Sequence, residues 1–367
     1  MFNGQTTKTL RVRLKDKHAI ALSKWAFEAN QVWNAANESS YMAWHIPVPE
    51  VGWIKGIWLS AYDVQKEVQS IRVERGFTLP SHSLQAVVAE HAKARQQFKK
   101  SKLRWRISSG AKRSLGWIPF KKGQLKWRNG QLWFAGVHLG CWDSYGLSQF
   151  EFLAGSFAED SRSRWYCNVA VKVATKPCQA KSSVGIDLGL KEVATCSNGA
   201  ALANDRHYKT LEEKLGKAQR AGKKDRARAI HNKIKNKRKD SIHKFTTRLV
   251  KDHAAIFVGD VSSPKLAKTK MAKSVLDAGW GMLKTQLKYK AMARSVVFEE
   301  VDEAYSTQTC SSCGEIPPSS PKGRSGLGMR VWTCSECGAE HQRDINAAKN
   351  ILAAGHRRLA VGIPSLQ

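Results

Sequence analysis

The chain has 367 residues, of which 42% are hydrophobic and 25% are charged, a composition typical of a globular protein with two or three domains. Its 61 Lys and Arg against 30 Asp and Glu leave a net charge of +31, which favours a polyanionic partner over a role in solubility alone. The sequence contains no signal peptide and no apolar run near ~18 residues, so we expect a cytoplasmic protein with no membrane partner.

The N-terminal part alternates between strand and helix patterns. Residues 9–14 alternate apolar and polar side chains, which predicts a strand. Apolar residues between Leu22 and Ala36 recur at helical spacing and predict a long amphipathic helix. Two further helices are expected over residues 57–73 and 83–99.

From about Arg104 the pattern becomes that of strands. Asn129-Gly130 between residues 125–128 and 131–134 is a strong signal for a hairpin. Strands are also expected near residues 150–152 and 165–173, and the first strand of the chain should rejoin them. The N-terminal half therefore reads as helices inserted into a β-domain.

Tryptophan is concentrated in this half, where 11 of the 13 lie before residue 166. Trp25 and Trp33 fall on the apolar face of the long helix, so we expect them in the core. Trp105, Trp117 and Trp127 lie among Lys and Arg, where contact with bases and simple packing remain open alternatives.

A linker over residues 176–183 precedes the second half, which begins with an apolar strand at 184–188 and a hairpin partner at 192–196. Residues 206–251 hold 17 Lys and Arg against 4 Asp and Glu, a net of +13 over 46 residues, and read as two helices broken near 221–222. A charge run is often only a solvated face, but this one is long and single-signed, which favours phosphate contact. The candidate nucleic-acid-binding residues are Lys223, Lys224, Arg226, Arg228, Lys233, Lys235, Lys237, Arg238 and Lys239.

Buried strands over residues 254–261 and 295–301 flank a helix expected at 278–292. Such a β-α-β unit places its two strands parallel in one sheet. Asp187 ends the strand at 184–188, and Asp344 opens a helix near the C-terminus. Both acids should therefore lie at the carboxyl ends of parallel strands, where α/β sheets place their sites. Taken alone, Asp187 could cap a turn and Asp344 could cap its helix.

Two CxxC pairs separated by twenty residues precede Asp344, and a glycine follows each pair. In a reducing compartment this spacing predicts a structural Zn²⁺ held by four thiolates with no open coordination position. The predicted ligands are Cys310, Cys313, Cys334 and Cys337.

Taken together, these motifs resemble the TnpB proteins of bacterial insertion sequences, which are related to the type V CRISPR effectors. The resemblance rests on residues 185–189 (Gly-Ile-Asp-Leu-Gly), the paired CxxC motifs, residues 301–310, residues 343–348 (Arg-Asp-Ile-Asn-Ala-Ala) and the basic helical insertion. It implies an α/β plus β fold, in which an RNase H-like (RuvC) nuclease domain carries a zinc ribbon and follows a β-barrel-like wedge domain with an inserted helical recognition domain. The expected boundaries are 1–14 and 103–180 for the wedge, 15–102 for the recognition domain, 181–309 and 339–367 for the nuclease (with 206–251 as its basic insertion), and 310–338 for the ribbon.

The resemblance also implies an activity. Family members are RNA-guided DNA endonucleases, so we expect a guide RNA from the transposon end, a double-stranded DNA target, and a bacterial protein that associates with the nucleoid when bound. The oligomeric state on RNA stays open between a monomer and a dimer. Hydrolysis of a phosphodiester by two Mg²⁺ ions needs about three carboxylates. Asp187 and Asp344 supply two of them.

The third carboxylate departs from the family pattern, because the usual Glu-Asp at the end of the second motif is Gly259-Asp260 here. Glu303, just past the next parallel strand, could reach into the space beside Gly259, and some relatives have relocated their glutamate in this way. Asp260 is a weaker candidate, because strand alternation points it away from the Gly259 face. We therefore expect Asp187, Glu303 and Asp344 to be the catalytic, magnesium-binding acids. The alternatives are a nuclease-inactive RNA-guided repressor and a guide-independent zinc-ribbon protein that binds nucleic acid.

Overall fold

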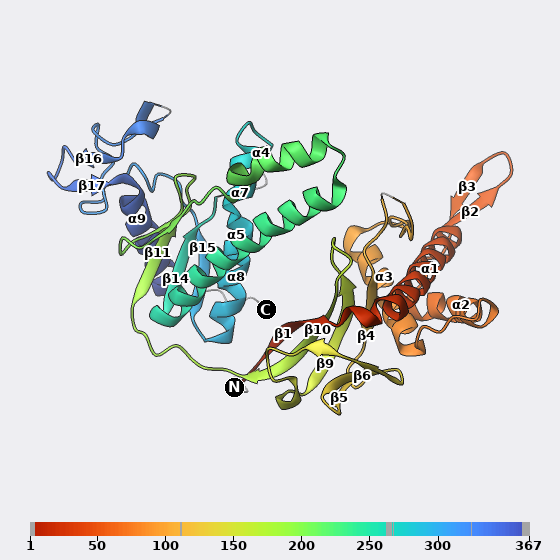
Figure 1. The fold of residues 1–367 in the computed structure, drawn as a ribbon. Coiled ribbons are helices and arrows are strands. Elements are labelled where there is room, and N and C mark those ends of the chain that lie inside the picture. The colour runs from red at the N-terminus through yellow and green to blue at the C-terminus, as the bar shows by residue number, and fades with distance from the viewer. Residues whose placement is uncertain (1–3, 111, 262–265, 267, 324, 362–367) are drawn as a thin grey trace. The chain divides into compact units, whose positions relative to one another are not determined.

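The computed structural model describes residues 4–110, 112–261, 266, 268–323 and 325–361 (Figure 1). The chain forms two compact units, Met1–Ala174 and Thr175–Gln367. Each unit has its own hydrophobic core, and each is described by itself below. Among the described residues, no helix combines the length and the apolar character needed to cross a membrane.

The first unit is built on a five-stranded antiparallel sheet with the order β4-β9-β10-β1-β8. Its centre is the pair β1 and β10, which run together from Gln5↔Ala174 to Arg13↔Tyr166. Leu10, Val12 and Leu14 point from β1 into the core, as the alternating pattern predicts. The expected return of the first strand to the later ones is confirmed. The bounds are β1 Gln5–Leu14, β4 Trp117–Phe120, β8 Cys141–Trp142, β9 Phe152–Glu159 and β10 Trp165–Ala174.

A second sheet in this unit contains β5 (Leu125–Arg128), β6 (Gln131–Phe134) and β7 (Val137–Leu139). The predicted hairpin is confirmed, with Asn129 and Gly130 both at positive φ (49° and 71°), as its two-residue turn requires. The prediction that strands begin near Arg104 is wrong. No strand precedes Trp117 in the described part of this stretch, because side chains of α1 bind the backbone there instead.

Three helices, α1 (Ala19–Trp44), α2 (Ala61–Glu74) and α3 (Ser81–Phe98), pack on this core. The second begins at Ala61 and not at residue 57, because Ser60 and Asp63 form a reciprocal capping box there. Between α1 and α2 lies a hairpin that the sequence did not suggest, β2 (His45–Val48) and β3 (Gly52–Lys55). Short 3₁₀ turns occupy Asp16–His18 and Leu147–Gln149.

The five tryptophans singled out in the sequence differ in their burial. Trp25 is buried and Trp33 packs against the core, which confirms the expectation for both. Trp117 and Trp127 also pack against the core, so packing accounts for them. Trp105 keeps 40% of its surface exposed.

The second unit contains a five-stranded sheet with the order β13-β12-β11-β14-β15. Strands β11, β14 and β15 are parallel, and β12 pairs antiparallel with β11, as predicted. Both faces of β14 are covered, so all of its residues are buried. The bounds are β11 Ser183–Asp187, β12 Glu192–Cys196, β13 Ala201–Ala203, β14 Ala255–Gly259 and β15 Val297–Val301.

One face of this sheet contributes Ile256 and Val258 to a core shared with α5 and α8, and the other contributes Phe257 to a core with α9. Glycine lets α9 approach closely, because a Cβ at Gly185 would lie 2.6 Å from the Leu352 amide nitrogen. The bounds are α4 His207–Arg220, α5 Lys224–Asp252, α7 Ala272–Ala278, α8 Trp280–Ala293 and α9 Arg343–Val361, with a 3₁₀ turn at Ser325–Gly328 and the ribbon strands β16 Val331–Thr333 and β17 Glu340–Gln342.

The two predicted basic helices are α4 and α5, and the break between them falls where it was expected. The helix expected at 278–292 is confirmed as α8, and Gly279, with a left-handed φ of 71°, separates it from α7, which the sequence did not suggest.

Candidate active site

The three predicted acids lie on three different elements but line the same cleft. Asp187 is the last residue of β11, Glu303 follows the end of β15 by two residues, and Asp344 lies in the first turn of α9. The parallel strands β11 and β15 bring the first two to one edge of the sheet. All three acids border a cleft of about 620 Å³.

Glu303 occupies the space that Gly259 leaves at the end of β14. A Cβ added to Gly259 would overlap Oε2 of Glu303 and would lie 3.3 Å from its Cβ and 3.2 Å from Cδ1 of Ile351. The Glu303 side chain and any side chain at position 259 therefore exclude one another. This is the arrangement that the sequence suggested, and its catalytic role stays a prediction.

The acids interact electrostatically. Burial, and then repulsion from Asp344 and Glu303, raise the pKa of Asp187 to about 7, although Arg343 opposes the shift. Burial also raises the pKa of Glu303, and Asp260 adds to this effect. Carboxylates with raised pKa values in a cleft are typical of functional sites.

Two arginines hold Asp344. Nε and Nη2 of Arg343 lie 2.9 and 2.8 Å from Oδ1, and Nη1 of Arg330 lies 3.3 Å from Oδ2. Arg330 belongs to the segment between the two CxxC pairs, and its carbonyl accepts a hydrogen bond from the Arg343 amide (2.8 Å). Both arginines border the cleft. Sequence reasoning missed Arg330, because no local pattern marks it.

The neighbouring acids point elsewhere. Asp260 is exposed and does not line the cleft. Glu299 pairs with Arg358 on α9 (3.5 Å), and Glu300 accepts from Nζ of Lys284 at 2.8 Å. Of the acids near the end of β15, Glu303 is thus the one placed toward Asp187.

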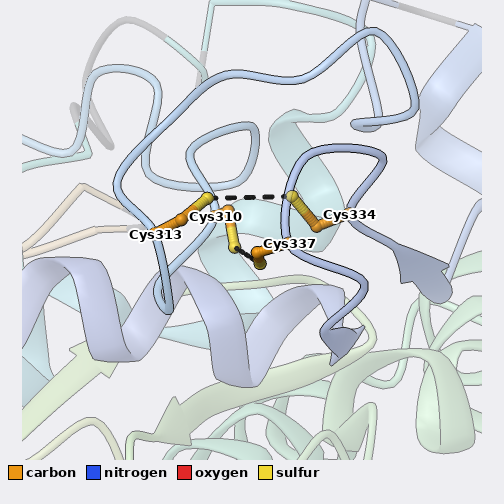
Figure 2. A group of neighbouring side chains, drawn as sticks. All are labelled: Cys310, Cys313, Cys334 and Cys337. Atoms are coloured by element: carbon orange, nitrogen blue, oxygen red, sulfur yellow. Dashed lines mark hydrogen bonds between the residues drawn. The ribbon is translucent and has the colours of Figure 1, made fainter.

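The four predicted cysteines form a compact cluster, shown in Figure 2. Their sulfur atoms all lie within 4.8 Å of one another, with 3.7 Å between Cys310 and Cys337 and 3.8 Å between Cys313 and Cys334. Four ligand atoms this close together could hold a single metal ion. Nε2 of His341 lies 3.0 Å from the sulfur of Cys310, a partner that the spacing alone did not reveal.

A buried asparagine fastens the ribbon to the start of α9. Oδ1 of Asn346 accepts from the Ser311 amide at 2.9 Å, and its Nδ2 donates to the Thr309 carbonyl at 2.7 Å. Asn350, one turn further, donates to the same carbonyl at 2.7 Å. The first CxxC pair is therefore held to the helix that carries Asp344.

The basic residues predicted to bind nucleic acid lie on α5 and just before it. Eight of the nine are exposed. The exception is Arg238, which is half-buried and whose Nη2 lies 2.7 Å from Oδ1 of Asp277 at the end of α7. Because this carboxylate also accepts from the Tyr208 amide, Arg238 helps to join α4, α5 and α7 and is less available to phosphates.

Two family profiles match the chain. One, described as "Probable transposase" (OrfB of IS605), matches residues 166–270, and the other, "Cas12f1-like, TNB domain", matches residues 280–351. A protein of Streptomyces pristinaespiralis named "Putative RNA-guided DNA endonuclease" is 28% identical over 372 residues, which cover 95% of this chain and 88% of that protein. The "Putative RNA-guided DNA endonuclease InsQ" of Escherichia coli K12 is 31% identical over 229 residues, which cover 54% of this chain and 56% of InsQ.

Among solved structures, the fold resembles that of the protein in a Cas12f1–sgRNA–target DNA complex. The TM-score is 0.59 at 12% identity, and the match covers 95% of this chain and 99% of that one. The likeness in fold thus includes residues of both units. With the profile matches and the relatives, these findings confirm the resemblance seen in the sequence, to the OrfB_IS605 transposases over residues 166–270 and to the Cas12f1-like TNB domain over residues 280–351.

Proposed function

We propose that this protein is a transposon-associated, RNA-guided endonuclease that cleaves target DNA in the cleft bordered by Asp187, Glu303 and Asp344. Two relatives that align with more than half of the chain are named as putative RNA-guided DNA endonucleases. The observation that carries the proposal is the placement of Glu303 in the space beside Gly259, because it gives a third acid to a chain that lacks the family's usual one.

The donor set fits Mg²⁺. Three carboxylates would supply hard oxygen ligands, and a bound cation would relieve the repulsion of Asp187 by Asp344 and Glu303. Bound Mg²⁺ would supply an activated water and would neutralise charge on the cleaved phosphate. We infer that Asp187, Glu303 and Asp344 hold these ions.

The two arginines contribute positive charge at the same place. Arg330 and Arg343 pair with Asp344 in the cleft, and a guanidinium donates two parallel hydrogen bonds to a phosphate as well as to a carboxylate. If Asp344 held a metal ion instead, both arginines would be available to the DNA backbone. We assign them to orienting the scissile phosphate.

We infer that the four cysteines hold one structural Zn²⁺. Four sulfur atoms about 2.3 Å from a tetrahedral ion lie about 3.8 Å apart, which matches the separations of 3.7 and 3.8 Å. His341 would donate to the Cys310 thiolate and fix its orientation. The ion would thereby stabilise the segment that delivers Arg330 to the cleft.

Specificity would come from a guide RNA drawn from the transposon end and paired with one DNA strand. The exposed lysines and arginines of α5 would bind its phosphates. The proposed domains are those expected from the sequence, with a wedge and a recognition domain in the first unit and a RuvC-like nuclease with its ribbon in the second.

The test is cleavage of a plasmid that carries a target chosen from the transposon flank. Protein with its co-purifying RNA and Mg²⁺ should cut, whereas RNA-free protein and Asp187→Ala should not. Cleavage at full rate without RNA would refute the guide. Guided binding without any cleavage by the wild-type protein would establish the repressor in place of the nuclease.

A further inference from the structure

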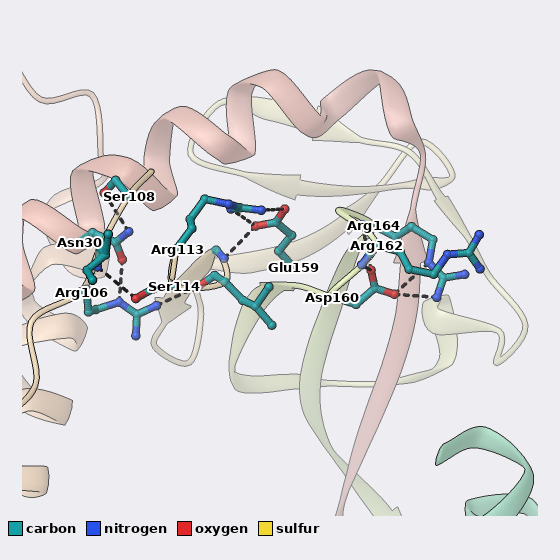
Figure 3. A network of polar contacts seen from close by, with 12 residues as sticks. Asn30, Arg106, Ser108, Arg113, Ser114, Glu159, Asp160, Arg162 and Arg164 are labelled. Carbon is teal, nitrogen blue, oxygen red and sulfur yellow. Dashed lines mark hydrogen bonds and ion pairs between the residues drawn. The ribbon is translucent and has the colours of Figure 1, made fainter. Parts of the chain in front are cut away.

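Three asparagines of α1 hold the segment that follows α3, two through its backbone and one through its side chains. Nδ2 of Asn37 donates to the Leu103 carbonyl (2.8 Å), and its Oδ1 accepts from the Leu103 amide (2.7 Å). Asn34 repeats this pair of bonds with Arg106, at 2.9 and 2.8 Å. Oδ1 of Asn30 accepts from Nε of Arg106 at 2.6 Å, as Figure 3 shows. The asparagines thus do for this segment what a neighbouring strand does in a sheet.

The segment held in this way, residues 99–108, is strongly basic, and we call it the basic segment. It contains five cations and no acid. Because the asparagines bind the backbone at Leu103 and Arg106, the side chains of Lys102, Arg104 and Trp105 are left exposed. The segment therefore presents fixed positive charge beside an aromatic ring.

Aromatic rings continue this surface along α1 and onto the β2–β3 hairpin. Nζ of Lys102 lies 5.6 Å from the ring centroid of Trp105 and 4.4 Å from that of Tyr41. Tyr41 stacks on His45 (4.2 Å between centroids, 29° between planes), and His45 contacts Trp53 at 4.5 Å. We call Trp105, Tyr41, His45 and Trp53 the aromatic row. Its two ends are exposed, by 40% at Trp105 and 53% at Trp53.

We propose that the basic segment and the aromatic row together bind an unpaired stretch of RNA. Exposed rings stack on bases of any sequence, and cations held beside them contact the phosphates between those bases. The bases of a duplex are already stacked and paired, so the rings reach only unpaired nucleotides. The choice of RNA over DNA rests on the proposed function, in which RNA is the single-stranded partner that accompanies the protein.

The asparagines explain why this surface is preformed. A loop of five cations would otherwise repel itself and sample many conformations. Asn34 and Asn37 each donate one hydrogen bond to the backbone and accept one from it, and these four bonds fix the course of the basic segment before any ligand arrives. The loss of conformational entropy in this segment then occurs when the protein folds, and it does not reduce the affinity for the ligand.

The first experiment locates the contact. Full-length protein, stripped of its own RNA at high salt, is mixed with a bromouridine-substituted, unstructured RNA of roughly 12 nucleotides and irradiated. Mass spectrometry should find cross-links at Trp53 and Trp105. Cross-links confined to the basic helices at 206–251 would overturn the proposal.

The second experiment measures affinity by fluorescence anisotropy with the same RNA. Trp53→Ala and Trp105→Ala should each weaken binding about 5- to 100-fold, and Trp53→Phe should restore most of it because stacking needs an aromatic face. Trp53→Leu keeps the apolar bulk but should bind like the alanine variant. The matched control is Trp142→Ala, since Trp142 is 63% exposed with Nζ of Lys15 5.8 Å from its ring but lies outside the row.

Affinities for an RNA duplex should not change in any of these variants. Equal losses on duplex and single strand, or losses in Trp142→Ala as large as in Trp53→Ala, would refute stacking at this site. Tighter binding of a DNA strand of the same sequence would refute the assignment to RNA. Because none of these readouts involves cleavage, a protein that passes them but never cuts DNA would refute the proposed function alone.

Discussion

Alanine at Gly259 should inactivate the nuclease without removing any acid. The added Cβ would overlap Oε2 of Glu303, so the carboxylate has to leave the space beside β14. Loss of even an indirect partner of a metal site costs about 10- to 100-fold in activity, so displacement of a ligand should cost at least about 100-fold. Glu303→Ala should lose activity to the same extent.

The fold should tolerate this change. The overlapping atom is the end of a flexible side chain, and the next neighbours lie at 3.2 and 3.3 Å, so the packing cost is at the low end of about 1–3 kcal/mol. Replacing glycine also stabilises by about 0.4–1 kcal/mol, through the unfolded chain. The two effects nearly cancel, and the melting temperature should shift by less than about 4 °C.

The assay is single-turnover cleavage of a guided target, with the melting temperature measured on the same preparations. Gly281→Ala is the matched control, because nothing lies within 4 Å of a Cβ at that position. Gly259→Glu combined with Glu303→Ala restores the family's usual arrangement and should recover cleavage. If Gly259→Ala cuts at the wild-type rate, Glu303 is not the third acid and Asp260 becomes the candidate.

Three further predictions concern the second unit. Metal analysis should find one zinc per chain, and Cys334→Ser should lose that zinc and lower cleavage more than guide binding; a zinc-free wild-type protein would contradict the site. Glutamine at Lys233, Lys235 and Lys237 should reduce the slope of log RNA affinity against log salt concentration by about 0.7–0.9 per residue. Arg238→Gln should mainly lower stability, because it loses its pair with Asp277. A slope in the lysine variants equal to that of the wild type would contradict phosphate contact. Burial lowers the pKa of Lys290 to about 8, below its value in the unfolded chain, so the unfolded form binds more protons between pH 8 and about 10.5. Over that window the unfolding free energy of wild type should rise relative to Lys290→Met by roughly 1 kcal/mol per pH unit, and a pH-independent difference in chemical denaturation would contradict it.

Local patterns in the sequence predicted much of the second unit. Apolar runs marked its parallel strands, and the spacing of the cysteines marked the ribbon. The suggestion that Glu303 lies beside Gly259 came from comparing adjacent strand ends, which is possible once the strands are known to be parallel. The catalytic use of Glu303 stays a prediction.

Contacts between distant segments could not be predicted. Arg330 reaches Asp344 through the fold of the ribbon, and Asn37 binds a backbone 66 residues away. Neither contact leaves a periodic trace, because a single polar side chain carries no information about its partner. The start of α2, in contrast, could have been predicted, because Ser60 and Asp63 have the spacing of a capping box in the sequence.

The pairing of β1 with β10 has a consequence for synthesis of the protein on the ribosome. The two strands are joined over nine register positions but are separated by about 150 residues of chain. At about 5–20 residues per second, β1 waits roughly 8–30 seconds for its partner. During that interval its inward-facing Leu10, Val12 and Leu14 have no sheet to join, so the nascent chain offers a strand edge that chaperones can bind.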